Sequence, residues 1–89
     1  METAKLRDGT ILSIGDEVET NWRGCKGYVF VICEINPYEW CESHTKVQVH
    51  LKGSPERKLK NTGMNPNSDS PPGLDANWFQ KVVNNKSTI

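Results

Sequence analysis

The chain has 89 residues, of which 35% are hydrophobic, and its 11 basic and 11 acidic side chains give a net charge of zero. This length allows one domain with a small core and excludes a second domain. The balanced charge argues against bulk electrostatic capture of nucleic acid. The absence of an apolar run of about 20 residues argues against a membrane helix.

The first residues, Met-Glu-Thr-Ala-Lys, lack the basic start and apolar segment of a secretory signal. We therefore expect a cytoplasmic protein. Its three cysteines, Cys25, Cys33 and Cys41, are an odd number in a chain without an export signal, which favours reduced thiols.

Residues 1–13 are predicted to form an N-terminal hairpin or arm, because Asp8-Gly9 is a tight-turn signal between two short apolar segments. The next strand is expected over Glu17–Trp22. There Val18, Thr20 and Trp22 alternate with polar residues, which indicates a strand with one wet face.

The segment Tyr28–Ile35 predicts a central strand, since it is apolar on both faces and rich in β-branched and aromatic residues. Asn36-Pro37 is expected to end it, because proline cannot donate to the ladder. A loop should follow over Tyr38–Thr45. The strand Lys46–Lys52 alternates, so we expect Val47, Val49 and Leu51 to be buried and Lys46, Gln48, His50 and Lys52 to be exposed.

The last third of the chain predicts an edge, a loop and a closing strand. Glu56–Lys60 is highly charged, as suits an edge strand. Residues 61–73 are rich in Asn, Ser, Pro and Gly and predict a long exposed loop. Leu74–Trp78 predicts one helical turn capped by Asp75. Phe79–Val83 is then the last strand, and residues 84–89 form a frayed tail.

These elements predict an all-β domain over residues 14–83: a small, five-stranded, strongly bent barrel, with one helical turn before the last strand. We expect two crossed sheets to close around Val18, Phe30, Val49 and Trp78.

The start of this domain is similar to a known family. Gly15-Asp16-Glu17-Val18 is followed by Gly24, Lys26-Gly27, Val29 and Ile32. This order resembles a KOW motif within the Src-homology-3-like small barrels, and also the start of Tudor and Agenet modules. In KOW domains the first hairpin loop contacts RNA or a protein, so the resemblance implies a contact role for Trp22, Arg23 and Lys26. The sequence-specific part covers some twenty residues.

Exposed aromatic side chains predict a binding surface for a protein partner. Tyr38 and Trp40 follow Pro37 in an expected loop, where packing explains large aromatics less readily. An exposed aromatic pair is typical of an interaction hot spot. The alternatives are that these rings fold back over the core, or that they join Trp22 and Tyr28 in a stacking platform or a cage for a cation.

Basic residues are concentrated in the second half of the chain and indicate an alternative function, the binding of nucleic acid. Residues 43–62 hold five bases against one acid, Glu56. On two adjacent strands these bases would converge, because neighbouring strands lie about 4.8 Å apart. Such a patch would bind phosphates weakly and with strong salt dependence, or would be an ordinary solvated face. The five bases are Lys46, Lys52, Arg57, Lys58 and Lys60.

Metal binding and catalysis are weighed and not favoured. Cys41-x-x-His44 is a single close pair, whereas structural zinc commonly takes two pairs. A Cys41–His44 nucleophile would need a third orienting group and a cleft. We therefore predict no metal, no cofactor and no enzymatic activity.

The sequence thus favours a non-catalytic module that binds a protein partner, such as a small adaptor or an inhibitor from a phage or mobile element. The alternative is binding of RNA or another single strand through the basic strand face. We expect a monomer, or a weak homodimer formed by strand addition at Glu56–Lys60.

Overall fold

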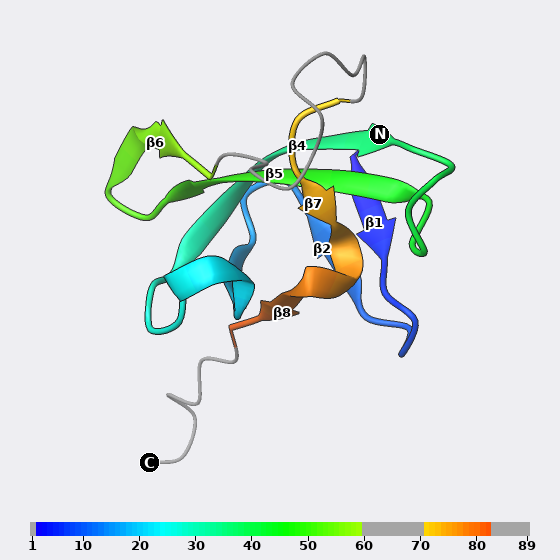
Figure 1. Ribbon diagram of the computed structural model, residues 1–89, viewed down its shortest axis with the longest axis horizontal. Coiled ribbons are helices and arrows are strands. Elements are labelled where there is room, and N and C mark those ends of the chain that lie inside the picture. The colour runs from blue at the N-terminus through cyan, green and yellow to red at the C-terminus, as the bar shows by residue number, and fades with distance from the viewer. Residues whose placement is uncertain (1, 60–70, 83–89) are drawn as a thin grey trace.

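The protein is all-β in the computed structural model, which describes residues 2–59 and 71–82 (Figure 1). Its strands are paired antiparallel, and its helical elements are two single 3-10 turns within the described residues. The strands are β1 (Thr3–Lys5), β2 (Ile11–Ser13), β3 (Glu17–Thr20), β4 (Phe30–Pro37), β5 (Thr45–Leu51), β6 (Ser54–Lys58), β7 (Leu74–Asp75) and β8 (Phe79–Lys81). The 3-10 turns are η1 (Trp22–Gly24) and η2 (Ala76–Trp78).

The predicted N-terminal hairpin is present. β1 pairs with β2, and Ala4 lies opposite Leu12. The turn between them depends on Gly9, whose φ of 94° favours glycine, and on the Asp8 carboxylate, which accepts a hydrogen bond from the Thr10 amide at 2.9 Å. Ala4 and Leu12 are both buried, so the hairpin is part of the core rather than a loose arm.

The remaining strands form one six-stranded sheet with the order β6-β5-β4-β3-β8, and β7 pairs with β5 beside this path. The first and last strands of this sheet along the chain, β3 and β8, are therefore neighbours, with Val18 opposite Lys81. β6 lies at one end of the sheet, as expected for its charged sequence. It begins and ends two residues earlier than the predicted Glu56–Lys60.

β4 differs from the prediction in its bounds and in its faces. It spans Phe30–Pro37 rather than Tyr28–Ile35, and Tyr28 is 55% exposed. The pairing with β5 shifts between Ile32 and Glu34, so Cys33 is an extra residue in a β-bulge. The bulge changes the alternation, and Ile35 therefore faces the same core as Phe30 and Ile32. The sequence of β4 is apolar at both alternating sets of positions, but because of the bulge its buried side chains all face one core.

β5 is the most enclosed strand, because every residue from Thr45 to Val49 is buried. The prediction that Lys46 and Gln48 are exposed is wrong. β7 pairs beside β5, with Leu74 opposite Val47. The chain approaches so closely there that a Cβ on Gly73 would lie 2.5 Å from the Val47 carbonyl oxygen. A further strand of the same sheet thus lies closely beside this part of β5, which a simple alternating pattern does not foresee.

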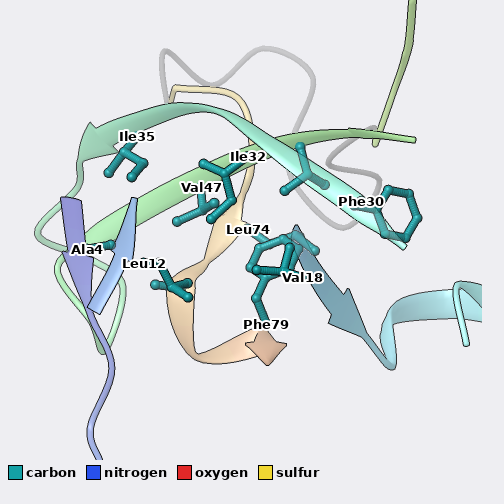
Figure 2. Packing of buried hydrophobic residues seen from close by; sticks show 11 residues of the cluster. Ala4, Leu12, Val18, Phe30, Ile32, Ile35, Val47, Leu74 and Phe79 are labelled. Carbon is teal, nitrogen blue, oxygen red and sulfur yellow. The ribbon is translucent and has the colours of Figure 1, made fainter. Parts of the chain in front are cut away.

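The core joins side chains from the hairpin, the sheet and η2. Figure 2 shows Leu12 from β2 and Phe79 from β8 pointing toward the same interior as Val18 and Ile32. Burial of each large aliphatic side chain stabilises the fold by about 1.5–3 kcal/mol. Trp78, which was expected in this core, is 48% exposed, and the small Ala76 of the same turn is buried instead.

Several predictions lie outside the described residues. These are most of the loop over 61–73, the tail over 84–89, Lys60, and the end of the last strand at Val83. Within the described part, no helix has the length and hydropathy that crossing a membrane requires.

Candidate binding surfaces

The turn between β3 and β4 presents an aromatic and a basic side chain together. After Thr20 the chain enters η1, where Arg23 has a φ of 31° and Gly24 a φ of 76°. The Cys25 amide donates to the Trp22 carbonyl at 2.8 Å and closes the turn. The Arg23 guanidinium lies over the Trp22 ring, 4.9 Å from its centroid. The predicted strand over Glu17–Trp22 therefore ends at Thr20, which leaves Trp22 half-buried on a turn.

A second tryptophan from the other end of the chain completes this surface. Trp78 meets Trp22 edge to face, with ring centroids 5.0 Å apart and an interplanar angle of 78°. Asp75 sets the position of η2, since its carboxylate accepts a hydrogen bond from the Asn77 amide at 3.0 Å. Ala76 anchors the turn in the core. Trp78 is thereby directed outward against Trp22.

An open groove of about 860 Å³ lies beside Trp78. One wall is the turn of the N-terminal hairpin, and the other is formed by η2 and β8. Lys26, a predicted contact residue, lines the groove together with Gly27. The charged side chains of its lining are of both signs: Arg7, Asp8, Glu19, Lys26 and Lys81.

The loop over residues 38–44 carries the other predicted aromatic pair, at the far end of β4. Trp40 is 81% exposed, as expected, whereas Tyr38 is half-buried. The Tyr38 amide donates to the His44 carbonyl at 2.9 Å, and the Glu42 amide donates to the Asp75 carboxylate at 3.0 Å. Asp75 ends β7 and caps η2, so the loop is held against both elements, and only one of its two aromatic rings is fully exposed.

Tyr38 is half-buried because it lies beside Lys46. The Lys46 ammonium is 4.5 Å from the centroid of the Tyr38 ring, and Lys46 as a whole is 2% exposed. Its Nζ has no hydrogen-bond partner among the described residues. Burial lowers the pKa of Lys46, and the nearby Cys41 thiol opposes this shift. Lys46 is therefore a buried structural residue and is not available to phosphates.

The predicted basic patch is correspondingly smaller. Lys52 is exposed at the β5–β6 turn, but its ammonium is paired with Glu17 at 3.1 Å. Arg57 and Lys58 are exposed on β6. Lys46 lies toward the opposite end of β5, and Lys60 is outside the described residues. The described bases do not converge on one surface as the strand pattern predicted.

The cysteines and histidines form no reactive arrangement in the described residues. All three thiols are free and half-buried, and burial raises the pKa of each. The Asp75 carboxylate raises the pKa of Cys41 further. A thiol with a raised pKa is a weak nucleophile near neutral pH. Nowhere in residues 2–59 and 71–82 do three His, Cys, Asp or Glu side chains gather as metal ligands do.

Sequence reasoning found one half of the tryptophan pair and missed the other. The resemblance to KOW domains implied a contact role for Trp22, Arg23 and Lys26, with Trp22 at the end of a predicted strand, whereas Trp78 was assigned to the core. One signal was available, because Ala76 and Trp78 share a single 3-10 turn. Only part of so short a turn can face the interior, and alanine fits where tryptophan does not.

We compared the chain with family models, with curated proteins and with solved structures, and none of the three comparisons gave a match.

Proposed function

We propose that this protein is a non-catalytic module that binds a protein partner at the surface formed by Trp22, Arg23, Trp78 and the adjoining groove. The observation that carries the proposal is the edge-to-face pair of Trp22 and Trp78, with Trp78 about half exposed beside the groove. Tryptophan and arginine are the residues most enriched at the energetic centres of protein interfaces.

We further propose that the domain is a small, strongly bent barrel of the Src-homology-3-like type. Three features support this fold. The bulge at Cys33 bends β4, the 3-10 turn η2 precedes the last strand, and β8 pairs with β3. In that frame the turn after β3 corresponds to the loop that contacts partners in KOW modules.

The charges favour a protein over a nucleic acid as the partner. Lys46 is buried, Lys52 is paired with Glu17, and the groove carries acids as well as bases. A phosphate backbone needs several unpaired bases along one track. A peptide needs apolar anchors and a few polar groups, which this surface offers.

Selection from a phage-displayed library of random linear peptides tests the proposal. We expect the purified domain to select a peptide family, and Trp78→Ala to weaken binding of the best peptide by at least about 30-fold, which corresponds to a hot-spot loss of about 2 kcal/mol. Trp40→Ala is the matched control, since it removes a more exposed tryptophan from the other end of β4 and should change the affinity less than threefold.

Two results would overturn this assignment. If Trp40→Ala removed binding and Trp78→Ala did not, the contact surface would be the loop over residues 38–44. If no peptide were selected and a fluorescent single-stranded RNA of mixed sequence bound at low salt, with loss of binding at high salt, the nucleic-acid alternative would stand.

A further inference from the structure

The outer edge of β8 has backbone groups that the sheet does not use. In an antiparallel ladder, hydrogen-bonded and non-hydrogen-bonded pairs alternate. The Val82 amide donates to the Glu17 carbonyl at 3.0 Å, so two residues earlier Gln80 is again a hydrogen-bonded pair with Glu19. Lys81 lies between them, and its N–H and C=O therefore point away from β3.

The residues that carry these backbone groups line the groove. Phe79, Gln80 and Lys81 line it on one side, and residues 6–8 and Thr10 line it on the other. The Lys81 ammonium reaches the Ile11 carbonyl at 3.0 Å, which fixes the hairpin opposite the edge of β8. β8 is the last strand in the order of the sheet, and in Figure 1 it lies below β7. No described residue accepts from the Lys81 N–H.

We propose that an extended segment of a protein partner adds to β8 as a further strand within this groove. This inference rests on the proposed function and names the form in which the partner is bound. Strand addition uses the backbone for affinity and alternate side chains for specificity. The Lys81 N–H and C=O and the Phe79 C=O supply the backbone partners.

The groove suits a peptide chain in size and in chemistry. Its volume of about 860 Å³ is within the range of roughly 300–1,000 Å³ that encloses small ligands. Leu6 and Trp78 supply apolar surface, while Glu19 and Lys26 supply charges of opposite sign. Mixed charge on the walls and a row of backbone donors and acceptors match an extended polypeptide better than a polyanion.

Amide hydrogen exchange tests the inference, with the best peptide from the library selection as the probe. The Lys81 amide is expected to exchange rapidly in the free domain and to slow at least tenfold in the complex. The Gln80 amide, bonded to β3 in both states, is the internal control. N-methylation of the peptide at alternate residues should reduce its affinity at least tenfold at one set of positions and less than threefold at the other.

A pair of variants at one position separates the backbone from the side chain. Lys81→Pro removes the outward N–H, and proline is tolerated on an edge strand when that group does not bond within the sheet. We expect Lys81→Pro to bind the peptide at least tenfold more weakly than Lys81→Ala does, because both variants lose the side chain and its contact with the Ile11 carbonyl but only Lys81→Pro also loses the N–H. Circular dichroism and the unfolding midpoint of both variants show whether they fold. If Lys81→Pro does not fold, the hydrogen-exchange measurement still tests strand addition, because it uses the domain without substitutions.

The outcomes distinguish this inference from the proposed function. If a peptide binds and Trp78→Ala weakens it while the Lys81 amide and the N-methyl series show no effect, strand addition is wrong and peptide binding stands. If no peptide binds, both are wrong. If the Lys81 amide becomes protected with rising protein concentration in the absence of peptide, the added strand comes from a second copy, and the inference of a different partner protein is overturned.

Discussion

The two ends of β4 carry similar aromatic sequences but have different structural roles. In the loop over residues 38–44, Tyr38 lies beside the buried Lys46, the Glu42 amide donates to Asp75 of β7, and the Ala76 amide of η2 donates to Ser43, so that of its two aromatic side chains only Trp40 extends into solvent. The turn over residues 21–27 stays open, with Trp22 against the half-exposed Trp78 beside a groove. The comparison shows that an aromatic residue in a loop is not thereby free, because Tyr38 lies beside the buried Lys46 whereas Trp78 stays about half exposed.

The largest effect is expected where the chain closes over β5. Gly73 has a φ of 114°, and a Cβ there would lie 2.5 Å from the Val47 carbonyl oxygen. Gly73→Ala should therefore lower the free energy of unfolding by about 3 kcal/mol or more, since backbone strain and overpacking act together. Urea denaturation followed by tryptophan fluorescence measures the change.

Gly53→Ala is the matched control for that substitution. Gly53 has a φ of 84°, but nothing lies within 4 Å of the position of its Cβ. It should cost only the strain of a left-handed residue, about 1 kcal/mol. Equal losses at the two glycines would contradict a close packing of residues 71–75 on β5.

The next largest effect is expected at Asp75, which joins η2 to the closed loop. Its carboxylate accepts from the Asn77 and Glu42 amides, each at 3.0 Å. Asp75→Ala should lower the free energy of unfolding by about 1–2 kcal/mol, because it removes a cap and leaves a second amide without its partner. Asp75→Asn keeps one oxygen acceptor and should lose about half as much. Thermal unfolding of the three proteins checks this order, and an Asn variant as unstable as the Ala variant would contradict it.

The alternation of apolar and polar residues predicted the all-β fold class. It also predicted which residues are buried in strands that have one covered face. Val18 and Thr20 are buried as the pattern of β3 predicts, and Asp75 caps a turn where expected. The pattern failed where a pairing with a distant part of the chain or an irregularity in a strand intervenes. Burial of Lys46 depends on β7, which is distant in sequence, and on the fold of the preceding loop, which brings Tyr38 beside it. The bulge at Cys33 is set by the pairing of two strands. Local patterns contain neither kind of information.

A smaller effect, with a distinct pH dependence, is expected at Lys46. Its pKa in the folded chain is lowered from 10.5 by burial. The unfolded chain therefore binds more protons than the folded chain between that lowered pKa and 10.5, and stability contributed by this group rises with pH through this window. Below the window the full cost of the buried charge remains.

Lys46→Met should remove this dependence and raise the free energy of unfolding at pH 7 by about 1 kcal/mol, since the cost of the buried charge exceeds the loss of the contact with Tyr38. The difference in unfolding free energy between the two proteins, measured from pH 7 to 10.5, should shrink as the pH rises. That difference cancels most of the contribution of the cysteine thiols, which are common to both proteins. A constant difference across the range would contradict the lowered pKa of Lys46.

The smallest effect on stability is expected at the open end of β4. Arg23 has a φ of 31°, so Arg23→Gly relieves a left-handed backbone while it removes the guanidinium from the Trp22 ring. The strain relieved is about 1 kcal/mol, and it is offset by the lost cation–π contact of about 0.5–1 kcal/mol and by the entropy of glycine. The free energy of unfolding should change by less than about 0.5 kcal/mol, whereas the affinity for the selected peptide should fall about threefold to tenfold. Arg23→Lys keeps the positive charge and the left-handed backbone but removes the guanidinium. Comparing it with Arg23→Gly therefore separates the effect of the guanidinium from the effect of the backbone strain. If Arg23→Gly destabilised the domain as much as Gly73→Ala does, the turn over residues 21–27 would be a structural closure like the loop over residues 38–44, and the contrast between the two ends of β4 would be lost.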